Sequence, residues 1–192
     1  MTFISLLLKI RARNRMTKKY YDRVSRVLHW FMAIVIIYAT VAGYVMHIFI
    51  DSKPEVFHYL SVINMSMATV ITPLFLLRWL WRHLRDPMPI VSNKTGHYKL
   101  ASLMHSLLYT LMFIVLLSGF LMLKSSYSFF GVYQIKNVIS SSEINNFFFL
   151  VHRAGCMILA ALITLHATAA LHHHLVVGNR TLYRMLGPIT QK

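Results

Sequence analysis

Four long stretches of this 192-residue chain contain no Lys, Arg, Asp or Glu, and they limit its fold more than any other feature. The hydrocarbon core of a membrane is about 30 Å thick, so a helix of roughly 20 apolar residues spans it. All four stretches reach that length, and they cover residues 27–50, 56–77, 100–123 and 154–179. Lipid offers backbone polar groups no hydrogen-bond partner, so each span must be helical. The sequence therefore predicts an all-α fold, a four-helix transmembrane bundle.

The expected organisation is one membrane domain over residues 20–192, preceded by a basic N-terminal extension over residues 1–19 that is poorly ordered. The helices of this domain are predicted at about residues 27–50, 56–81, 100–123 and 147–177. Cys156 is the one cysteine of the chain, which excludes an internal disulfide. A Cys-x-x-Cys-His motif is also missing from the sequence, so any haem is not attached covalently in the c-type manner.

The balance of charge is strongly basic, with 20 Lys and Arg against 5 Asp and Glu. Such a balance is also found in nucleic-acid-binding proteins. Here the charges avoid the apolar stretches instead of lining one helix face, so membrane lipid and not nucleic acid is the expected partner. Most basic residues lie in the N-terminal segment, around the second connection and in the C-terminal tail. By the positive-inside bias, both the N and the C terminus are predicted to be cytoplasmic.

Histidines recur inside the predicted spans. His29 and His105 lie near the inner ends of the first and third spans, and His152 and His166 both lie on the fourth. A separation of 14 residues is close to four helical turns, so His152 and His166 share one face about 21 Å apart. Neutral imidazole binds haem iron well, and two stacked haems would require this arrangement of one helix. A lone intramembrane histidine can instead be a helix–helix hydrogen-bond partner, and for His105 both interpretations stay open.

Four segments of the chain resemble the bacterial cytochrome b561 family, and the likeness runs from about Tyr20 nearly to the end. They read YDRVSRVLHW, LMHSLLYTLMFIVLLSGFLML, LVHRAGCMILAALITLHATAALHHH and TLYRML. The resemblance implies a multi-pass protein of the bacterial inner membrane whose four helices hold two b-type haems through pairs of histidines. Some members of that family carry electrons from periplasmic superoxide to membrane quinone. Others are quinone-linked partners of dehydrogenases.

The resemblance also implies roles for individual residues. It matches His29 and His166 to the pair that binds the inner haem iron, and His152 to the fourth-helix ligand of the outer haem. The second-helix ligand position falls on Asn64, which is not a normal haem ligand. Two haems are still expected, because His152 would otherwise be an unpaired imidazole within the bundle, and one haem is the alternative. Possible replacements for the missing ligand are His58, ranked first because it lies on the same span, then His47, Met65 or Met67; a single-ligand outer haem is a further alternative.

A histidine triplet, His172 to His174, follows His166 near the inner interface. The resemblance favours His173 for a role in delivering protons to ubiquinone, and imidazole titrates near neutral pH as such a role requires. A hydrated interfacial cluster or a surface metal site are the other interpretations. We expect His173, His105 and Arg153 to act on substrates, with Arg153 beside His152 as the outward-facing charge that attracts small anions.

The hypothesis from the sequence is an inner-membrane b-type cytochrome that transfers electrons between a periplasmic donor, with superoxide as the candidate, and membrane ubiquinone. Such a chain would be an oxidoreductase in its own right. The first alternative is a haem b membrane anchor that passes electrons between a partner dehydrogenase or hydrogenase and quinone. The second is a single-haem or non-redox membrane protein.

Overall fold

The structure is a computed structural model, and it describes residues 20–49, 51–85, 95–178 and 181–187. In chain order the elements are α2 (Arg23–Phe49), α3 (Pro54–Leu84), α4 (Thr95–Leu121), β1 (Tyr127–Phe129), β2 (Tyr133–Ile135), α5 (Ser142–Leu175) and α6 (Thr181–Leu186). The predicted extension over residues 1–19 lies outside the described residues.

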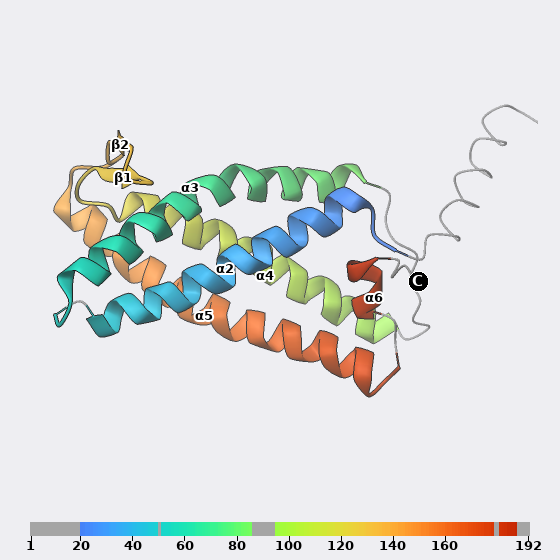
Figure 1. Ribbon diagram of the computed structural model, residues 1–192. Helices are drawn as coiled ribbons and strands as arrows, with labels where there is room; N and C mark the ends of the chain where they lie inside the picture. Colours follow the sequence, from blue (N-terminus) through green and yellow to red (C-terminus); the bar gives the residue numbers. More distant parts are fainter. Residues whose placement is uncertain (1–19, 50, 86–94, 179–180, 188–192) are drawn as a thin grey trace, which may run out of the picture.

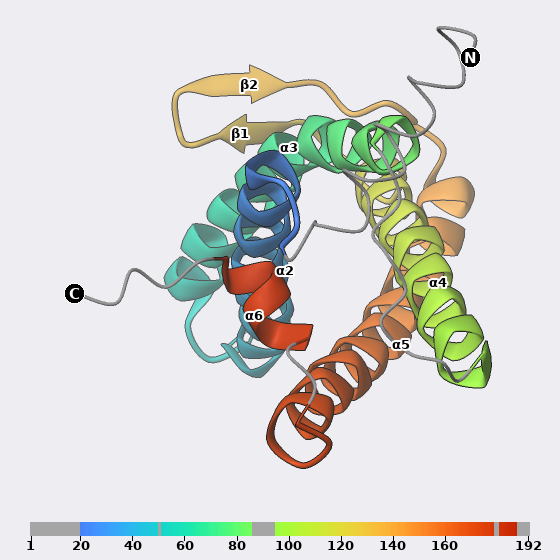
Figure 2. The ribbon, with the colours of Figure 1, turned by 90° about the vertical axis from the view of Figure 1, so that its right-hand side faces the viewer.

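The four long helices are each long and apolar enough to cross a membrane, with mean hydropathies between 1.8 and 2.0. They run lengthwise along one bundle (Figure 1) and follow one another round its axis in the end-on view of Figure 2. The predicted four-helix transmembrane bundle is therefore confirmed. Each helix begins a few residues before its expected start, because helical hydrogen bonding continues past the apolar stretch into polar residues.

Within the bundle the helices form two closely packed pairs, α2 with α3 and α4 with α5, whereas α3 and α4 approach each other at few points. The α2–α3 pair contains a cluster of side chains that are no more than 4% exposed, namely Met32, Val35, Ile71 and Phe75. Three partly buried side chains of α4 pack against this cluster, and they are Tyr109, Met112 and Leu116. The apolar core thus joins α2 to α3 and reaches across to α4.

The outside of the bundle is apolar too. Ile34, Phe113 and Leu165 come from three different helices, and each is at least half exposed. In water such a surface would favour aggregation, but in a bilayer the acyl chains cover it. The exposed side chains are thus the lipid-facing surface that the hydropathy of the helices requires.

A two-stranded β-hairpin follows α4, which the all-α prediction did not include. Strands β1 and β2 pair antiparallel, and β1 packs against α3. The Phe130 backbone N–H donates to Ser66 Oγ at 2.8 Å, and the hydroxyls of Tyr127 and Thr69 lie 2.7 Å apart. Strands of three residues are too short to leave a periodic signal in the sequence.

Asn145 closes the same end of the bundle. This residue lies near the start of α5 and is only 1% exposed. Its side-chain amide donates to the carbonyls of Leu121 at 2.8 Å, Leu123 at 3.1 Å and Ile139 at 3.3 Å. One side chain therefore fastens the end of α4 and the chain after the hairpin to α5.

The opposite end of the bundle is closed by α6. Arg26 of α2 donates to the Leu186 carbonyl at 2.8 Å, and the Trp30 indole donates to the Met185 carbonyl at 3.3 Å. The start of α2, the end of α5 and α6 all lie at this end (Figure 1), which is called the terminal end below. That the terminal end faces the cytoplasm stays a prediction.

Candidate functional site

Each of the four long helices places one polar side chain at a similar depth near the terminal end. These are His29 on α2, Arg78 on α3, His105 on α4 and His166 on α5. His29 lies within electrostatic range of Arg78, His105 and His166. Polar groups inside a membrane bundle are costly, so four that gather at one depth indicate a functional centre. We call this set the inner cluster.

Arg78 holds His29 in place within the inner cluster. The guanidinium Nη2 lies 3.1 Å from His29 Nδ1, and Nη1 donates to the Ser25 carbonyl at 3.0 Å. A guanidinium only donates, so His29 Nδ1 accepts, and the proton of the neutral ring sits on Nε2. The His29 ring also meets Trp30 edge-on, with ring centroids 5.6 Å apart.

His166 has His105 as its neighbour. Their ring centroids lie 5.3 Å apart, and the rings are nearly perpendicular. His105 Nδ1 is 2.8 Å from the Ala101 carbonyl one turn earlier, so Nδ1 carries the proton and Nε2 keeps its lone pair. The resemblance paired His166 with His29, and the structure places His105 beside His166 as well.

The inner cluster fits haem better than a bare ion. Among the described residues, no three His, Cys, Asp or Glu side chains converge closely enough to hold a metal ion. His29 and His166 instead come from different helix pairs, and α2 is not closely packed against α5. Two imidazoles on helices that are not closely packed against each other suit a flat macrocycle between them.

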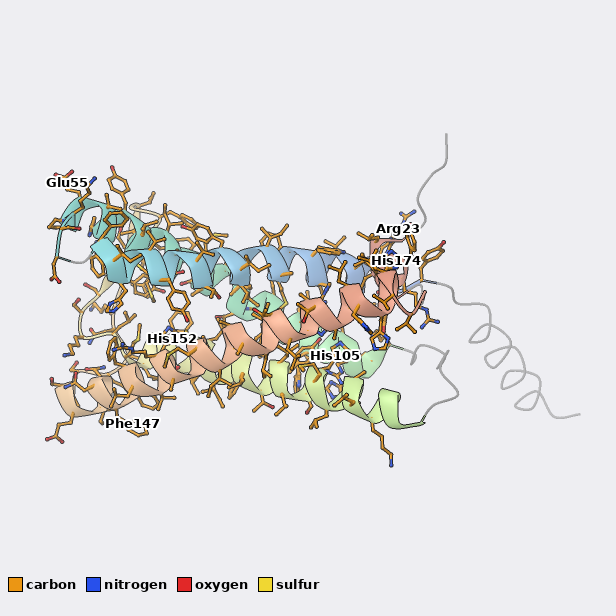
Figure 3. All side chains as sticks on the ribbon, turned by 90° about the horizontal axis from the view of Figure 1, so that it is seen from below. Arg23, Glu55, His105, Phe147, His152 and His174 are labelled. Atoms are coloured by element: carbon orange, nitrogen blue, oxygen red, sulfur yellow. The ribbon has the colours of Figure 1, made fainter. Side chains whose placement is uncertain are left out.

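His152 lies nearer the other end of the bundle, as Figure 3 shows relative to His105. Its Nδ1 is 3.0 Å from the Val115 carbonyl, which therefore accepts the Nδ1 proton and leaves Nε2 as the basic nitrogen. Cys156 Sγ lies 3.4 Å from Nε2. Gly119 of α4 makes room for the ring, since a Cβ there would lie 3.2 Å from His152 Cε1. This tautomer is the one that iron ligation through Nε2 requires.

The chain matches the family model described as prokaryotic cytochrome b561 over residues 20–188. The chain belongs to the prokaryotic cytochrome b561 family. It is similar to cytochrome b561 homolog 1 of Escherichia coli (strain K12), at 38% identity over 104 residues, which cover 53% of this chain and 59% of that relative. It is also similar to cytochrome b561 homolog 2 of the same strain, at 25% identity over 89% of this chain and 93% of the relative.

Membership of the cytochrome b561 family makes this chain a multi-pass protein of the bacterial inner membrane. It is a b-type cytochrome, with haem b as its cofactor and electron transfer as its task. Membrane lipid surrounds it.

Asn64 lies at the α3 position where the resemblance predicts a haem ligand, and its Oδ1 is buried and has no hydrogen-bond partner among the described residues. His47 and His58 are exposed at the ends of α2 and α3 opposite the terminal end. Met67 packs against the apolar cluster of α2 and α3. Met65 lies one residue from Asn64 and is half-buried. The ligand alternatives named from the sequence therefore occupy different environments, and the choice among them stays a prediction.

The remaining predicted site residues lie towards the two ends of α5. Arg153 is exposed next to His152. His174 meets Tyr183 of α6, with ring centroids 4.8 Å apart, and the His172 and His173 rings are 5.9 Å apart. The triplet thus lies at the terminal end, where α6 packs against α5.

Sequence reasoning missed Arg78 as a member of the inner cluster. It counted this arginine only as a charge that marks the end of an apolar stretch. One signal was present, because Arg78 stands at a depth on its span that corresponds to that of His29 on the neighbouring span. A cation at that depth needs a partner inside the bundle.

Proposed function

We propose that this chain carries electrons across the inner membrane, from a donor at the outer face to ubiquinone at the terminal end. His29 and His166 would bind the iron of an inner haem b, and His152 that of an outer one. The observation that carries the proposal is the placement of His29 and His166 at one depth on helices from separate pairs. Bound haem supplies a one-electron couple between ferric and ferrous iron.

Arg78 prepares the inner site for an acidic cofactor. Its guanidinium is half-buried, and no carboxylate of the described residues pairs with it. A buried cation without a counter-charge is unfavourable, so the carboxylates of haem would stabilise it. Arg78 then has two roles, as an anchor for these carboxylates and as a control on the tautomer of His29.

The tautomer of His29 has a definite consequence. Ligation through Nε2 needs the lone pair of that nitrogen, which requires the ring proton on Nδ1. With the proton there, Nδ1 no longer accepts from the Arg78 guanidinium. Haem binding would therefore release Arg78 from His29 and free it for the haem carboxylates.

The outer site rests on His152, which lies about 21 Å from His166 along α5. The second ligand would be His58, with His47 or Met65 as alternatives, or the iron would keep a single protein ligand. We favour two haems, because an electron would cross 21 Å slowly without a second centre. Arg153, exposed beside His152, would attract an anionic donor.

The reaction proposed for the whole chain is the oxidation of superoxide coupled to the reduction of ubiquinone. Two superoxide ions each give one electron and leave as O₂, and ubiquinone takes up two electrons and two protons. His173 and His105, both near the terminal end, would relay the protons. An imidazole suits this task because one ring nitrogen can accept a proton while the other donates one.

The test is an assay of the purified chain with a superoxide source and a soluble ubiquinone. We expect quinone reduction that slows as the salt concentration rises, because a charged substrate is steered by the field of the protein. A haem-loaded protein that is inert to superoxide but exchanges electrons with quinol would refute superoxide oxidation and favour the membrane-anchor alternative. A well-folded protein without pigment would overturn the proposal altogether.

A further inference from the structure

A groove of about 420 Å³ lies between α3 and α4 near the terminal end. It forms because these two helices approach each other at few points. Its walls carry the aromatic rings of Trp79 and Phe113, its polar edge carries Arg82 and His83, and Ser106 and Thr110 place hydroxyls along it. Neither family membership nor the proposed electron transfer uses this groove.

The groove opens on the outside of the bundle. Trp79 is 45% exposed and Phe113 is 50% exposed, so both present apolar surface to the surroundings. Phe75, at the floor, is 3% exposed and belongs to the apolar core. On α4, Ser106 follows His105 by one residue, so it points about 100° away from the inner cluster. A molecule in the groove would therefore touch lipid on one side and protein on the other.

The polar edge of the groove has an excess of positive charge. Arg82 stacks over the Tyr109 ring, with its guanidinium carbon 4.9 Å from the centroid, and Arg78 lies 6.0 Å from the same ring. Neither guanidinium pairs with a carboxylate of the described residues. Asp22 is the one described acid at the terminal end, and its oxygens accept from Ser25 and Trp81 instead.

We propose that this groove binds one anionic phospholipid, with the phosphate on Arg82 and an acyl chain along Trp79 and Phe113. A guanidinium forms charge-assisted hydrogen bonds to phosphate, and stacking on the Tyr109 ring positions the Arg82 guanidinium. The Ser106 and Thr110 hydroxyls match the ester oxygens below the phosphate. Basic pockets between transmembrane helices select anionic head groups in this way. A zwitterionic lipid should bind less tightly, because its own ammonium repels the arginines.

The experiment measures lipid retained by the haem-loaded, detergent-purified protein, by native mass spectrometry during titration with phosphatidylglycerol or phosphatidylethanolamine. We expect one phosphatidylglycerol to bind about tenfold more tightly than phosphatidylethanolamine, since both offer a phosphate to Arg82 but only phosphatidylethanolamine brings an ammonium close to the arginines. Arg82→Gln removes the phosphate contact and should abolish this preference. Thr110→Trp fills an exposed part of the groove without changing its charge, and it should weaken both lipids.

Lys124→Gln is the matched control, because Lys124 is exposed at the other end of the bundle and the variant loses the same charge. It should bind lipid as the wild type does. Equal retention of both lipids by the wild type, or equal effects of Arg82→Gln and Lys124→Gln, would overturn the proposal. Displacement of the bound lipid by ubiquinone at stoichiometric concentration would also overturn it and assign the groove to quinone.

Discussion

Asp22 is expected to hold the terminal end of the bundle together, and Asp22→Ala tests this directly. The carboxylate precedes α2 and accepts from the Ser25 backbone N–H at 2.9 Å and from the Ser25 hydroxyl at 2.7 Å, as an N-cap does. It also accepts from the Trp81 indole N–H at 2.9 Å, which joins the start of α2 to the end of α3. Alanine removes all three hydrogen bonds.

The size of the effect follows from these contacts. Loss of an N-cap costs about 1 kcal/mol. A hydrogen bond to a charged group contributes about 1.5 kcal/mol, which we reduce to roughly 0.5 kcal/mol because the Asp22 carboxylate is exposed to solvent. The free energy of unfolding should thus fall by roughly 1.5 kcal/mol, and for a chain of this length the melting temperature by roughly 3–6 °C.

Asp22→Asn provides a sharper comparison. The Ser25 N–H and the Trp81 N–H both donate to Oδ2, so one amide oxygen can still accept both. Asparagine is also a good N-cap, and we expect this variant to melt within about 2 °C of the wild type. Asp51→Ala is the control, since Asp51 is exposed in the turn between α2 and α3 at the other end. An Asp22→Ala variant that melts like Asp51→Ala would refute the reasoning.

The same carboxylate predicts a pH dependence. Burial opposes ionisation of Asp22, but hydrogen bonds from Ser25 and Trp81 outweigh it and hold the pKa of this carboxyl below its ordinary value of 3.8. A group with a lowered folded-state pKa stabilises the fold above the unfolded-state pKa and loses that effect as the pH falls through the folded-state pKa. The melting difference between the wild type and Asp22→Ala should therefore be constant near neutral pH and shrink below about pH 3.8. A difference that persists unchanged at lower pH would contradict a role for the charge.

Two further substitutions test the packing at the end of the bundle opposite the terminal end. Gly119→Ala places a Cβ 3.2 Å from His152 Cε1, so the ring must move by a few tenths of an ångström, and the absorbance spectrum of the haem near His152 should change. Gly43→Ala is the control, because a Cβ there would have nothing within 4 Å, and its spectrum should match that of the wild type. Identical spectra for both variants would argue against His152 as a ligand. Asn145→Ala removes the side-chain donor from the Leu121 and Leu123 carbonyls, whereas the Ile139 carbonyl still accepts from Asn137 Nδ2, and the free energy of unfolding should fall by about 2 kcal/mol in denaturant titrations. The exposed neighbour Asn146→Ala should have little effect, and equal losses would contradict this assignment.

Much of the fold was predictable, because a helix that crosses a membrane requires a long apolar stretch, which is visible in the sequence. The apolar stretches located the four spans, and the spacing of His152 and His166 placed both on one helix. The neighbour of His166 was not predictable, because it depends on how α4 is rotated against α5. Small residues decide that rotation: a Cβ on Gly155 would lie 3.0 Å from Val115 Cγ2. The spacing of residues along the sequence does not reveal such a close approach of two helices, whereas the three-dimensional structure does.

The inner cluster was only partly visible for a related reason. His29 stood out because imidazole is rare within an apolar stretch, whereas Arg78 lay at the edge of its stretch and looked like an interfacial charge. Its contact with His29 depends on the packing of α2 against α3. The sequence position of Asn64 raised doubt about the outer site, and the structure adds that its buried Oδ1 lacks a hydrogen-bond partner.

The central claim is that His29 and His166 bind the same haem, and the most direct measurement is haem content with electron paramagnetic resonance on purified single variants. We predict that the wild type contains low-spin haem b, and that His29→Ala and His166→Ala each lose the same low-spin signal together with one haem per chain. Thr168→Ala, an exposed change on the same helix two residues beyond His166, should retain both. Wild-type haem content and an unchanged low-spin signal in either histidine variant would contradict the account.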